Sequence, residues 1–307
     1  MTDILTVTLN PALDVAGETG TIRATRKVRT ANERYDPGGG GLNVARVVVE
    51  LGGAAEALFI AGGETGDLLE RLVRQHGLKA RRIAVDGLTR IGFTIRETST
   101  GLEYRFVPEG QKVPAAAIEA CLDAVAGHES RYVVASGSLP AGAPPDILAR
   151  MARLAAARGA RFVLDSSGAG LSETLGQAPV HLVKPSRGEL ERLVGRPLEI
   201  EAAGEAAAAM VSRGEADIVA VTLGADGAIL ADRDGVEILP AIHVRVRSTV
   251  GAGDSFVAAM TLALARGEPP RAAFRLGIAA GAAAAMTPGT ELCRAADVAR
   301  LHASRWR

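Results

Sequence analysis

Residues 131–168 read RYVVASGSLPAGAPPDILARMARLAAARGARFVLDSSG and contain the repeating unit that decides the fold. A short, mostly unbroken apolar run over 131–137 precedes an Ala- and Leu-rich segment with helical spacing over 144–158, and a second such run follows over 161–168. Short, continuous apolar runs indicate parallel strands that are buried on both faces. The stretch therefore predicts a strand, a helix and a second strand, joined by a right-handed crossover.

The same unit recurs along most of the chain. Further apolar runs lie at 4–9, 57–63, 180–186 and 217–224, and further helical patterns lie at 66–77 and 201–213. Strands that alternate with helices in this way predict an α/β fold, a three-layer α/β/α sandwich around a largely parallel central sheet. Two segments, about 14–36 and 91–107, instead show the alternation of half-exposed antiparallel strands. Because these segments are not contiguous, we expect them to form a small β-sheet lid on a single domain over residues 1–307.

The composition excludes several classes of protein. The 307 residues carry 35 Lys and Arg against 35 Asp and Glu, so the chain lacks the excess positive charge that nonspecific nucleic-acid binding requires. No apolar stretch reaches the roughly 18 to 20 residues of a membrane span, and the first residues lack the basic region of a signal peptide. Two cysteines, Cys121 and Cys293, are too few for a disulfide framework or a Cys-based zinc site. We therefore expect a cytoplasmic protein with reduced thiols that binds neither nucleic acid nor membranes.

The candidate catalytic element is STVGAGDS at 248–255, which precedes an apolar helical segment. The small residues Gly251, Ala252 and Gly253 leave backbone N–H groups open to an anion at the positive end of the helix dipole. Asp254 follows directly, and a carboxylate there is suited to take a proton from a hydroxyl group that attacks a phosphate. For an isolated element of this kind, a helix cap after a flexible turn is the structural alternative.

A second candidate element is DPGGGGLNVAR at 36–46, where four glycines lead into an apolar helix. A dinucleotide-binding fingerprint does not fit because, counting from Gly38, Asn43 takes the place of the last glycine. A Walker A loop does not fit because Gly-Lys occurs nowhere in the chain. The glycines let a ligand approach the backbone, and the Asn43 amide suits a polyhydroxylated ligand. A plain glycine-rich turn is the alternative.

Two further elements are weaker when taken alone. Asp14 follows the first strand within TLNPALD (8–14), where it could hydrogen-bond sugar hydroxyls or only take part in a turn. The stretch TLGADGA (222–228) predicts a strand, a tight turn and a strand, which could form one wall of an adenine pocket or only a hairpin.

The stretch KPSRGEL (184–190) carries both a chemical and a structural pattern. Lys184 could meet a phosphate, and Glu189 could hold a magnesium-bound water. Ser186 and Glu189 also have the spacing of a helix capping box. The two interpretations are compatible.

Taken together, these motifs resemble those of the PfkB, or ribokinase-like, family of sugar kinases. That family carries an early Gly-Gly-x-x-x-Asn element and a late Gly-Ala-Gly-Asp element, and both occur here in that order about 200 residues apart. Within the family the chain is most similar to the phosphofructokinase branch, and there to the minor bacterial 6-phosphofructokinases of the PfkB type. The features that carry this similarity are PGGGGLNVAR, TR at 89–90, EYRFV at 103–107, SGSLP at 136–140, LDSSG at 164–168, STVGAGDS and GTELC at 289–293.

The resemblance implies an ATP-dependent kinase that phosphorylates fructose 6-phosphate at its 1-hydroxyl to give fructose 1,6-bisphosphate. It implies Mg²⁺ and K⁺ beside ATP, and a homodimer that pairs through the lid sheet. 1-Phosphofructokinase and tagatose-6-phosphate kinase are the alternatives with the same chemistry, and a noncatalytic sugar-phosphate or nucleotide sensor is the alternative without it. The 1-phosphofructokinase branch more often has Gly-Gly-Lys-Gly where this chain has Gly38 to Gly41, which favours the 6-phosphate substrate.

The resemblance also implies roles for individual residues. Asp254 is the expected base, with the amides of Gly251, Ala252 and Gly253 around the transferred phosphoryl group. The residues expected at the sugar phosphate are Asp14, Gly39, Gly40 and Asn43 for its hydroxyls and Lys27, Arg29, Arg90, Arg105 and Ser138 for its phosphate. Those expected at the nucleotide are Lys184, Ser186 and Glu189 for its phosphates and magnesium and Thr222, Gly224 and Gly227 for the nucleoside. Backbone groups near Ser248, Val250 and Gly289 are expected to surround potassium.

The charge of the lid segments supports a phosphorylated substrate independently. Their cations are Arg23, Arg26, Lys27, Arg29, Arg34, Arg90, Arg96 and Arg105, against the carboxylates Asp14, Glu18, Glu33, Asp36, Glu97 and Glu103. A neutral sugar would leave such a cluster of cations uncompensated. A solvated basic face is the alternative.

Overall fold

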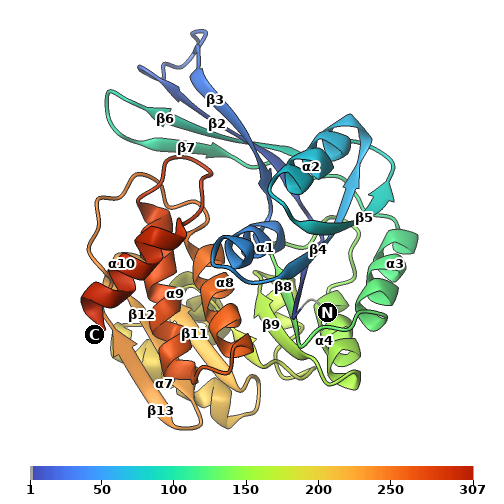
Figure 1. Cartoon of the computed structure of the whole chain (residues 1–307), viewed down its shortest axis with the longest axis vertical. Coiled ribbons are helices and arrows are strands. Elements are labelled where there is room, and N and C mark those ends of the chain that lie inside the picture. Colours follow the sequence, from blue (N-terminus) through green and yellow to red (C-terminus); the bar gives the residue numbers. More distant parts are fainter. Residues whose placement is uncertain (1–2, 307) are drawn as a thin grey trace.

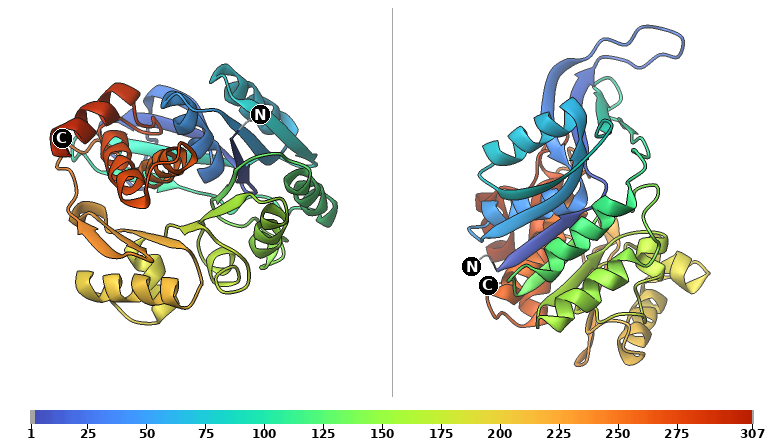
Figure 2. Two further views of the ribbon diagram at one scale, coloured as in Figure 1. Left: turned by 60° about the horizontal axis from the view of Figure 1, so that its bottom comes forward. Right: turned by 90° about the vertical axis from the view of Figure 1, so that its right-hand side faces the viewer.

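The structure, a computed structural model, describes residues 3–306. Figures 1 and 2 show a broad sheet with helices on both faces and a second, smaller sheet that projects beyond it. Among the described residues, no helix combines the length and apolar character needed to cross a membrane. The arrangement confirms the predicted α/β sandwich with a lid sheet.

The central sheet contains nine strands in the order β13-β12-β11-β10-β9-β8-β1-β4-β5. Its strands are β1 (Ile4–Thr8), β4 (Ala55–Gly62), β5 (Lys79–Val85), β8 (Tyr132–Ser136), β9 (Arg161–Asp165), β10 (Leu182–Val183), β11 (Ile218–Thr222), β12 (Ala228–Asp232) and β13 (Gly235–Leu239). Neighbours from β11 to β5 pair in parallel, whereas β12 and β13 pair antiparallel at one edge. The carboxyl ends of the parallel strands therefore share one edge of the sheet, where ligands bind in folds of this class.

Ten α-helices are present among the described residues. They are α1 (Gly40–Glu50), α2 (Gly63–Gln75), α3 (Ala115–Ala126), α4 (Ile147–Ala157), α5 (Ala169–Ser172), α6 (Arg187–Val194), α7 (Ile200–Ser212), α8 (Ala252–Ala265), α9 (Pro270–Ala285) and α10 (Ala295–Arg305). Helices α1, α2, α8, α9 and α10 contribute to a hydrophobic cluster on one face of the sheet, and α3 to α7 contribute to a cluster on the other.

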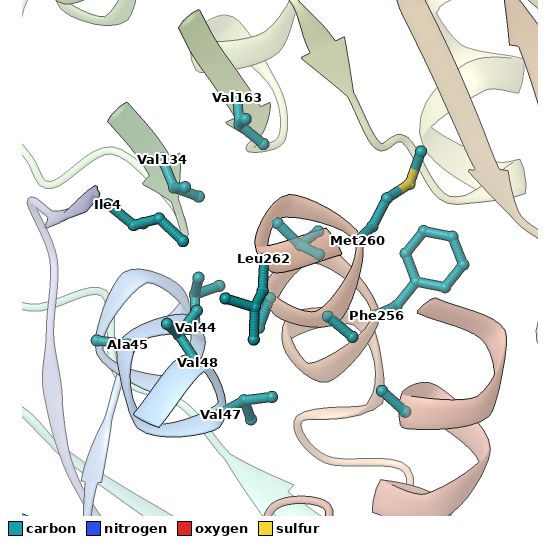
Figure 3. Packing of buried hydrophobic residues seen from close by; sticks show 14 of the residues in the cluster. Ile4, Val44, Ala45, Val47, Val48, Val134, Val163, Phe256, Met260 and Leu262 are labelled. Carbon is teal, nitrogen blue, oxygen red and sulfur yellow. The ribbon is translucent and has the colours of Figure 1, made fainter. Parts of the chain in front are cut away.

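The strands are apolar throughout because both of their faces are covered. Along β1, Ile4 belongs to one cluster and Leu5 to the other, and both are almost completely buried. Figure 3 shows Val48 of α1 and Leu262 of α8 packed toward Ile4. Burial of each such side chain contributes about 1.5 to 3 kcal/mol to folding. This core fixes the first turns of α1 and α8 relative to the sheet.

The lid is a four-stranded sheet in the order β3-β2-β6-β7. Its strands are β2 (Ala12–Thr19), β3 (Ala31–Gly38), β6 (Ile91–Glu97) and β7 (Glu103–Phe106). The pairs β2–β3 and β6–β7 are antiparallel, as expected, but β2 and β6 pair in parallel. The expectation of a wholly antiparallel lid is therefore wrong at this pair. The chain leaves the lid after β3, builds β4 and β5 of the main sheet, and returns in the original direction.

The two faces of the lid differ in character. The register aligns Tyr35, Val15, Phe93 and Phe106 in one row across the four strands. Tyr35, Phe93 and Phe106 are exposed to 49, 43 and 57% on this outer face. Asp14 lies on the opposite face because successive strand residues alternate between faces. The lid is thus polar toward the body of the protein and apolar on the outside.

Candidate active site

Asp254 lies in the first turn of α8, and Asn43 lies in the first turn of α1. The Nδ2 group of Asn43 donates a hydrogen bond of 2.9 Å to Oδ2 of Asp254. Gly251 occupies the N-cap position of α8 with a φ of 73°, a left-handed conformation that favours glycine. Because Gly251 is the N-cap, the alternative that Asp254 merely caps this helix is wrong. The two strongest motifs of the sequence meet at one point.

The surroundings of Asp254 raise the pKa of its carboxyl to about 6. Burial is the largest cause, and the negative charge of Asp165 adds to it. The hydrogen bond from Asn43 and the positive charge of Lys184 act in the opposite direction. A carboxylate with a pKa near 6 is ionised at neutral pH and is a stronger base than an ordinary aspartate.

Lys184 lies beside the first turn of α8, after β10. Its Nζ forms a 3.0 Å ion pair with Oδ1 of Asp165, and Ser136 donates to Oδ2 of the same carboxylate over 3.1 Å. A Cβ atom on Gly253 would lie 3.6 Å from Nζ of Lys184, so the amine faces the glycine directly. Burial, the largest single cause, would lower the pKa of Lys184, but the negative charges of Asp165, Glu189 and Asp254 together outweigh it and raise the pKa. Lys184 is therefore a buried cation beside open backbone amides.

The glycine loop before α1 permits close packing at the ends of β1 and β8. Gly39, the N-cap of α1, has a φ of 112°. A Cβ atom on Gly40 would meet Oγ of Ser136 and would lie 2.9 Å from the backbone nitrogen of Gly137. A Cβ atom on Gly41 would lie 2.5 Å from the carbonyl oxygen of Val7. These glycines bring α1 close enough to the sheet for Asn43 to reach Asp254.

Asp14 lies on the inner face of the lid, in a slot between two glycines. A Cβ atom on Gly38 or on Gly92 would collide with the Asp14 carboxylate. Burial raises the pKa of Asp14, although the positive charges of Arg105 and Arg90 oppose this effect. The charge of Asp14 also acts on Asp254, so the lid carboxylate lies within electrostatic range of Asp254.

The basic residues predicted to bind the sugar phosphate differ in how many hydrogen bonds their side chains make. The Arg90 guanidinium donates to the carbonyl oxygens of Asn10 and Pro108 over 2.7 Å each, and to that of Pro11 over 3.3 Å. Ser138 accepts a 3.2 Å hydrogen bond from Nδ2 of Asn10. Ser138 and Arg90 are thus joined through one asparagine, and Arg90 fastens two loops together.

Lys27 and Arg29 of the same chain do not lie beside Arg90 and Ser138. Both are exposed and lie in the loop 20–30 between β2 and β3. Figure 1 and the right view of Figure 2 show this loop as the outermost projection of the lid, away from the ends of the main strands. The two cations therefore belong to a loop that extends beyond the body of their own chain.

The three residues predicted to contact the nucleoside, Thr222, Gly224 and Gly227, line one cavity of about 460 Å³, whereas Lys184, Ser186 and Glu189 are not part of its lining. It contains Thr222, Gly224 and Gly227 on one side and Gly253 of α8 on another. Its other lining residues are Ala225, Ala228, Ala241, Ile242, His243, Val244, Val246, Thr249, Ala252, Phe256, Ile278, Gly281, Ala282 and Ala285. β11, the short 3₁₀ turn over Gly224–Asp226 and β12 also form the predicted hairpin. A mainly apolar cavity that opens onto a helix start can hold a base at one end and phosphates at the other.

Ser186 and Glu189 form the predicted capping box at the start of α6. Oε2 of Glu189 accepts hydrogen bonds of 2.8 Å from the backbone nitrogen and from Oγ of Ser186. Ser186 also forms an isolated parallel bridge with Thr222, at the rim of the nucleotide cavity. The capping interpretation is confirmed, and the two side chains lie beside the nucleotide wall.

The segment predicted to hold potassium forms a tight turn next to α9. The backbone nitrogen of Val250 donates to Oγ of Ser248 over 3.2 Å, and that of Arg247 donates to the carbonyl oxygen of Ala285 over 2.8 Å. Gly289 follows α9 with a φ of 57°. The Ser248 hydroxyl oxygen keeps a second lone pair, so the segment offers this oxygen and backbone carbonyl oxygens to a cation, and carbonyl oxygens suit K⁺.

Arg46 contacts the site residue Asn43 but is not among the site residues predicted from the sequence. Nη1 of Arg46 donates to Oδ1 of Asn43 over 3.2 Å, and the side chain is buried. The available signal was a single cation in the apolar helix segment LNVARVVV (42–49), three residues after Asn43. Such spacing places both side chains on the same face of the helix.

A family model described as pfkB family carbohydrate kinase matches residues 8–297 of the chain. The ATP-dependent 6-phosphofructokinase isozyme 2 of Mycobacterium tuberculosis is 44% identical over 300 residues, which cover 97% of this chain and 88% of that protein. The isozyme 2 enzyme of Escherichia coli is 38% identical and covers 99% of both chains. A 1-phosphofructokinase of Xanthomonas campestris is 36% identical over 85% of this chain and 83% of its own length.

The fold has close counterparts among solved structures. Phosphofructokinase-2 from Escherichia coli, in complex with substrates and products, superposes with a TM-score of 0.95 at 37% identity over 100% of both chains. The same enzyme has also been solved in complex with potassium, with fructose-6-phosphate, and in a tetrameric inhibited form.

Proposed function

The chain belongs to the pfkB family of carbohydrate kinases, and we propose that it is an ATP-dependent 6-phosphofructokinase. It would convert fructose 6-phosphate and ATP into fructose 1,6-bisphosphate and ADP, a reaction of glycolysis, in the cytoplasm. The observation that carries the proposal is the pairing of Asp254 with Asn43 at the start of α8, between the nucleotide cavity and Asp14. The greater similarity to 6-phosphofructokinases than to 1-phosphofructokinases supports the choice of substrate.

The proposed chemistry is an in-line phosphoryl transfer. Asp254 takes the proton of the 1-hydroxyl group while that oxygen forms a bond to the γ-phosphorus of ATP. The bond from the γ-phosphorus to the β,γ-bridging oxygen breaks, and ADP leaves with that electron pair. Backbone amides of Gly251, Ala252 and Gly253 stabilise the charge on the transferred group, as helix N-termini do for phosphates.

The proposed sugar site comprises Asp14, Gly39, Gly40 and Asn43. Asp14 accepts hydrogen bonds from sugar hydroxyls in its slot between glycines, and Gly39 and Gly40 let the sugar approach the backbone. Asn43 uses one amide hydrogen for Asp254, which leaves the second for the substrate. These contacts would place the 1-hydroxyl group next to Asp254.

The phosphate already on the sugar requires cations. We assign three residues of the body and the inner lid to this phosphate, namely Ser138, Arg90 and Arg105. We also assign to it Lys27 and Arg29 of the loop 20–30. The outward position of that loop suits a homodimer in which each lid reaches the partner subunit. The exposed row of Tyr35, Phe93 and Phe106 supports this pairing, because large aromatic side chains at the surface mark protein interfaces.

The proposed nucleotide site uses Lys184, Ser186 and Glu189 at the phosphates. Lys184 lies beside Gly253 and so can meet the phosphates of ATP, and Glu189 has its Oε1 atom outside the capping box for a magnesium-bound water. Thr222, Gly224 and Gly227 surround the nucleoside in the cavity. Magnesium neutralises phosphate charge when bound, and carbonyl oxygens near Ser248, Val250 and Gly289 would hold potassium.

Steady-state kinetics on three sugar phosphates test the substrate. With ATP, Mg²⁺ and K⁺, we expect kcat/KM for fructose 6-phosphate to exceed that for fructose 1-phosphate and for tagatose 6-phosphate by about 10-fold or more. Turnover of another phosphosugar with negligible turnover of fructose 6-phosphate would reject this substrate. Ligand binding without phosphate transfer to any of them would favour the sensor instead.

A further inference from the structure

Arg46 is a buried arginine whose guanidinium group is held on three sides. Only 8% of the residue's surface is exposed. Nη1 donates to the carbonyl oxygen of Pro37 over 3.0 Å and to Oδ1 of Asn43 over 3.2 Å, and Nη2 lies 3.3 Å from Oδ1 of Asp36. Because the guanidinium is a rigid planar fork, these partners together fix the direction of each donor.

The contact with Arg46 determines which way the Asn43 amide faces. Its oxygen accepts from Arg46, and its nitrogen donates to Asp254 over 2.9 Å. A rotation of the amide by half a turn would set its oxygen against the Asp254 carboxylate and its NH₂ group against the guanidinium. Both new contacts would be repulsive, since neither pair would combine a donor with an acceptor. Arg46 therefore keeps the donor of Asn43 on Asp254.

Asp36, the anionic partner of Arg46, belongs to the lid strand β3 and is almost completely buried. It forms a 2.7 Å ion pair with Nε of Arg34 and accepts a 2.6 Å hydrogen bond from Oγ1 of Thr290. These contacts join the lid, the start of α1 and the loop after α9 at one carboxylate. Arg46 thus connects an anchored lid residue to the amide that holds Asp254.

We propose that Arg46 is a positioning residue for the reaction, acting through Asn43 to orient the carboxylate of Asp254 toward the 1-hydroxyl group. This inference rests on the proposed function, because it requires Asp254 to accept the proton. The carboxylate of Asp36, near the end of the lid strand β3, holds Arg46 in place. The orientation of the Asp254 carboxylate therefore depends on a contact with the lid.

The expected signature is a change in the pH dependence of kcat. The hydrogen bond from Asn43 lowers the pKa of Asp254, so its loss raises that pKa. Because Asp254 acts when ionised, the acidic limb of the kcat profile then moves to higher pH. The other charged groups at Asp254 are Asp165, Lys184 and Asp14. Those at Arg46 are Asp36, Arg34, His76, Asp14 and Asp254 itself, so the charge of Arg46 also acts on Asp254 directly.

Arg46→Met removes the donors and keeps an unbranched stem. We expect kcat to fall by about 10-fold or more, since small displacements of a reacting group have large effects on rate. We expect the acidic limb to move upward and the KM for ATP to change by less than about twofold, because uniform binding is unaffected. Arg46→Lys keeps the charge but not the planar fork, and should show a smaller loss of kcat with a limb displaced in the same direction.

Two controls separate positioning from folding and from other titrations. Arg82 is matched to Arg46, since its guanidinium donates to the carbonyl oxygen of Ala61 and pairs with Asp67 and Glu70 away from the site. Arg82→Met should leave the limb unmoved, as should His76→Gln. In the Asn43→Ala background, Arg46→Lys should cause no further displacement of the limb, because lysine keeps the charge that acts directly on Asp254 and the route through Asn43 is already absent.

Several results would overturn the proposal: an unmoved limb in both Arg46 variants, equal effects of Arg46→Met and Arg82→Met, or additive effects of Arg46→Lys and Asn43→Ala. If Arg46→Met fails to fold, Arg46→Lys and its cycle with Asn43→Ala decide the question. Failure of the proposed function is visible separately, because Asp254→Asn would then keep its activity whatever the Arg46 variants do.

Discussion

The floor of the site and the lid above it satisfy their polar groups in different ways. The floor consists of the carboxyl ends of β1, β8, β9 and β10 with the first turns of α1 and α8. There Asn43 pairs with Asp254, and Lys184 pairs with Asp165. In the outer lid, within residues 3–306, the side chain of Lys27 has no hydrogen bond or ion pair, and the aromatic row is open to solvent. The polar groups of the floor therefore pair within one chain, whereas the outer lid leaves a cation and an aromatic row exposed.

The sharpest test of the floor is Asp254→Asn. We expect kcat to fall by about 100-fold or more because the amide cannot accept the substrate proton. Binding of ATP and fructose 6-phosphate should persist, since the neutral amide keeps nearly the same shape. Turnover and equilibrium binding of both ligands, measured on the same preparation, check this prediction. An unchanged rate would remove Asp254 from the role of base.

The lid is tested by Phe93→Asp, which places a charge in the centre of the outer apolar row. We expect dimers to dissociate, because burial of an unpaired carboxylate opposes association. We also expect the KM for fructose 6-phosphate to rise by about 10-fold while the KM for ATP stays within about twofold. Dissociation would remove only the partner subunit's loop 20–30, which we propose binds the phosphate of the sugar.

Sedimentation and steady-state kinetics measure both effects of Phe93→Asp. Val236→Asp is the matched control, because Val236 is exposed to 41%, close to the 43% of Phe93, but lies on the edge strand β13. A Phe93→Asp variant that remains dimeric would show that the lid's outer face is not the interface.

A smaller effect on the floor comes from pH. Because burial raises the pKa of Asp254 to about 6, the base is ionised at pH 7.5 and becomes protonated as the pH falls through 6. We expect kcat to fall by about 10-fold for each unit of pH well below that value, for one essential ionisation. A rate profile between pH 5 and 8.5 checks this, and a limb near pH 4 would show that burial does not control this carboxyl.

The main sheet could be predicted from the sequence because its strands are buried on both faces. Continuous apolar runs such as 131–137 and 161–168 locate β8 and β9, which span Tyr132–Ser136 and Arg161–Asp165. The capping box of Ser186 and Glu189 was equally visible, since both partners lie within one turn. The parallel pairing of β2 with β6 was not visible, because it depends on the course of the chain through β4 and β5.

The contacts that complete the site depend on partners far apart in the chain. Asn43 and Asp254 are separated by 211 positions, and Asp36 and Thr290 by 254. Motifs identified both members of the first pair because each has a chemical reason to bind phosphate or sugar. Nothing in the sequence relates Asp36 to Thr290, so the network behind Arg46 emerges only from the fold.

The parallel pair of β2 and β6 also has a consequence for how the protein is made. β2 ends at Thr19 and β6 begins at Ile91, so a ribosome-bound nascent chain cannot close the lid before β4, α2 and β5 have been synthesised. Pairings of such long range form late, after local structure. A designer who wished to transplant this lid onto another scaffold would need two coordinated insertion points, because no contiguous cassette of the gene encodes it.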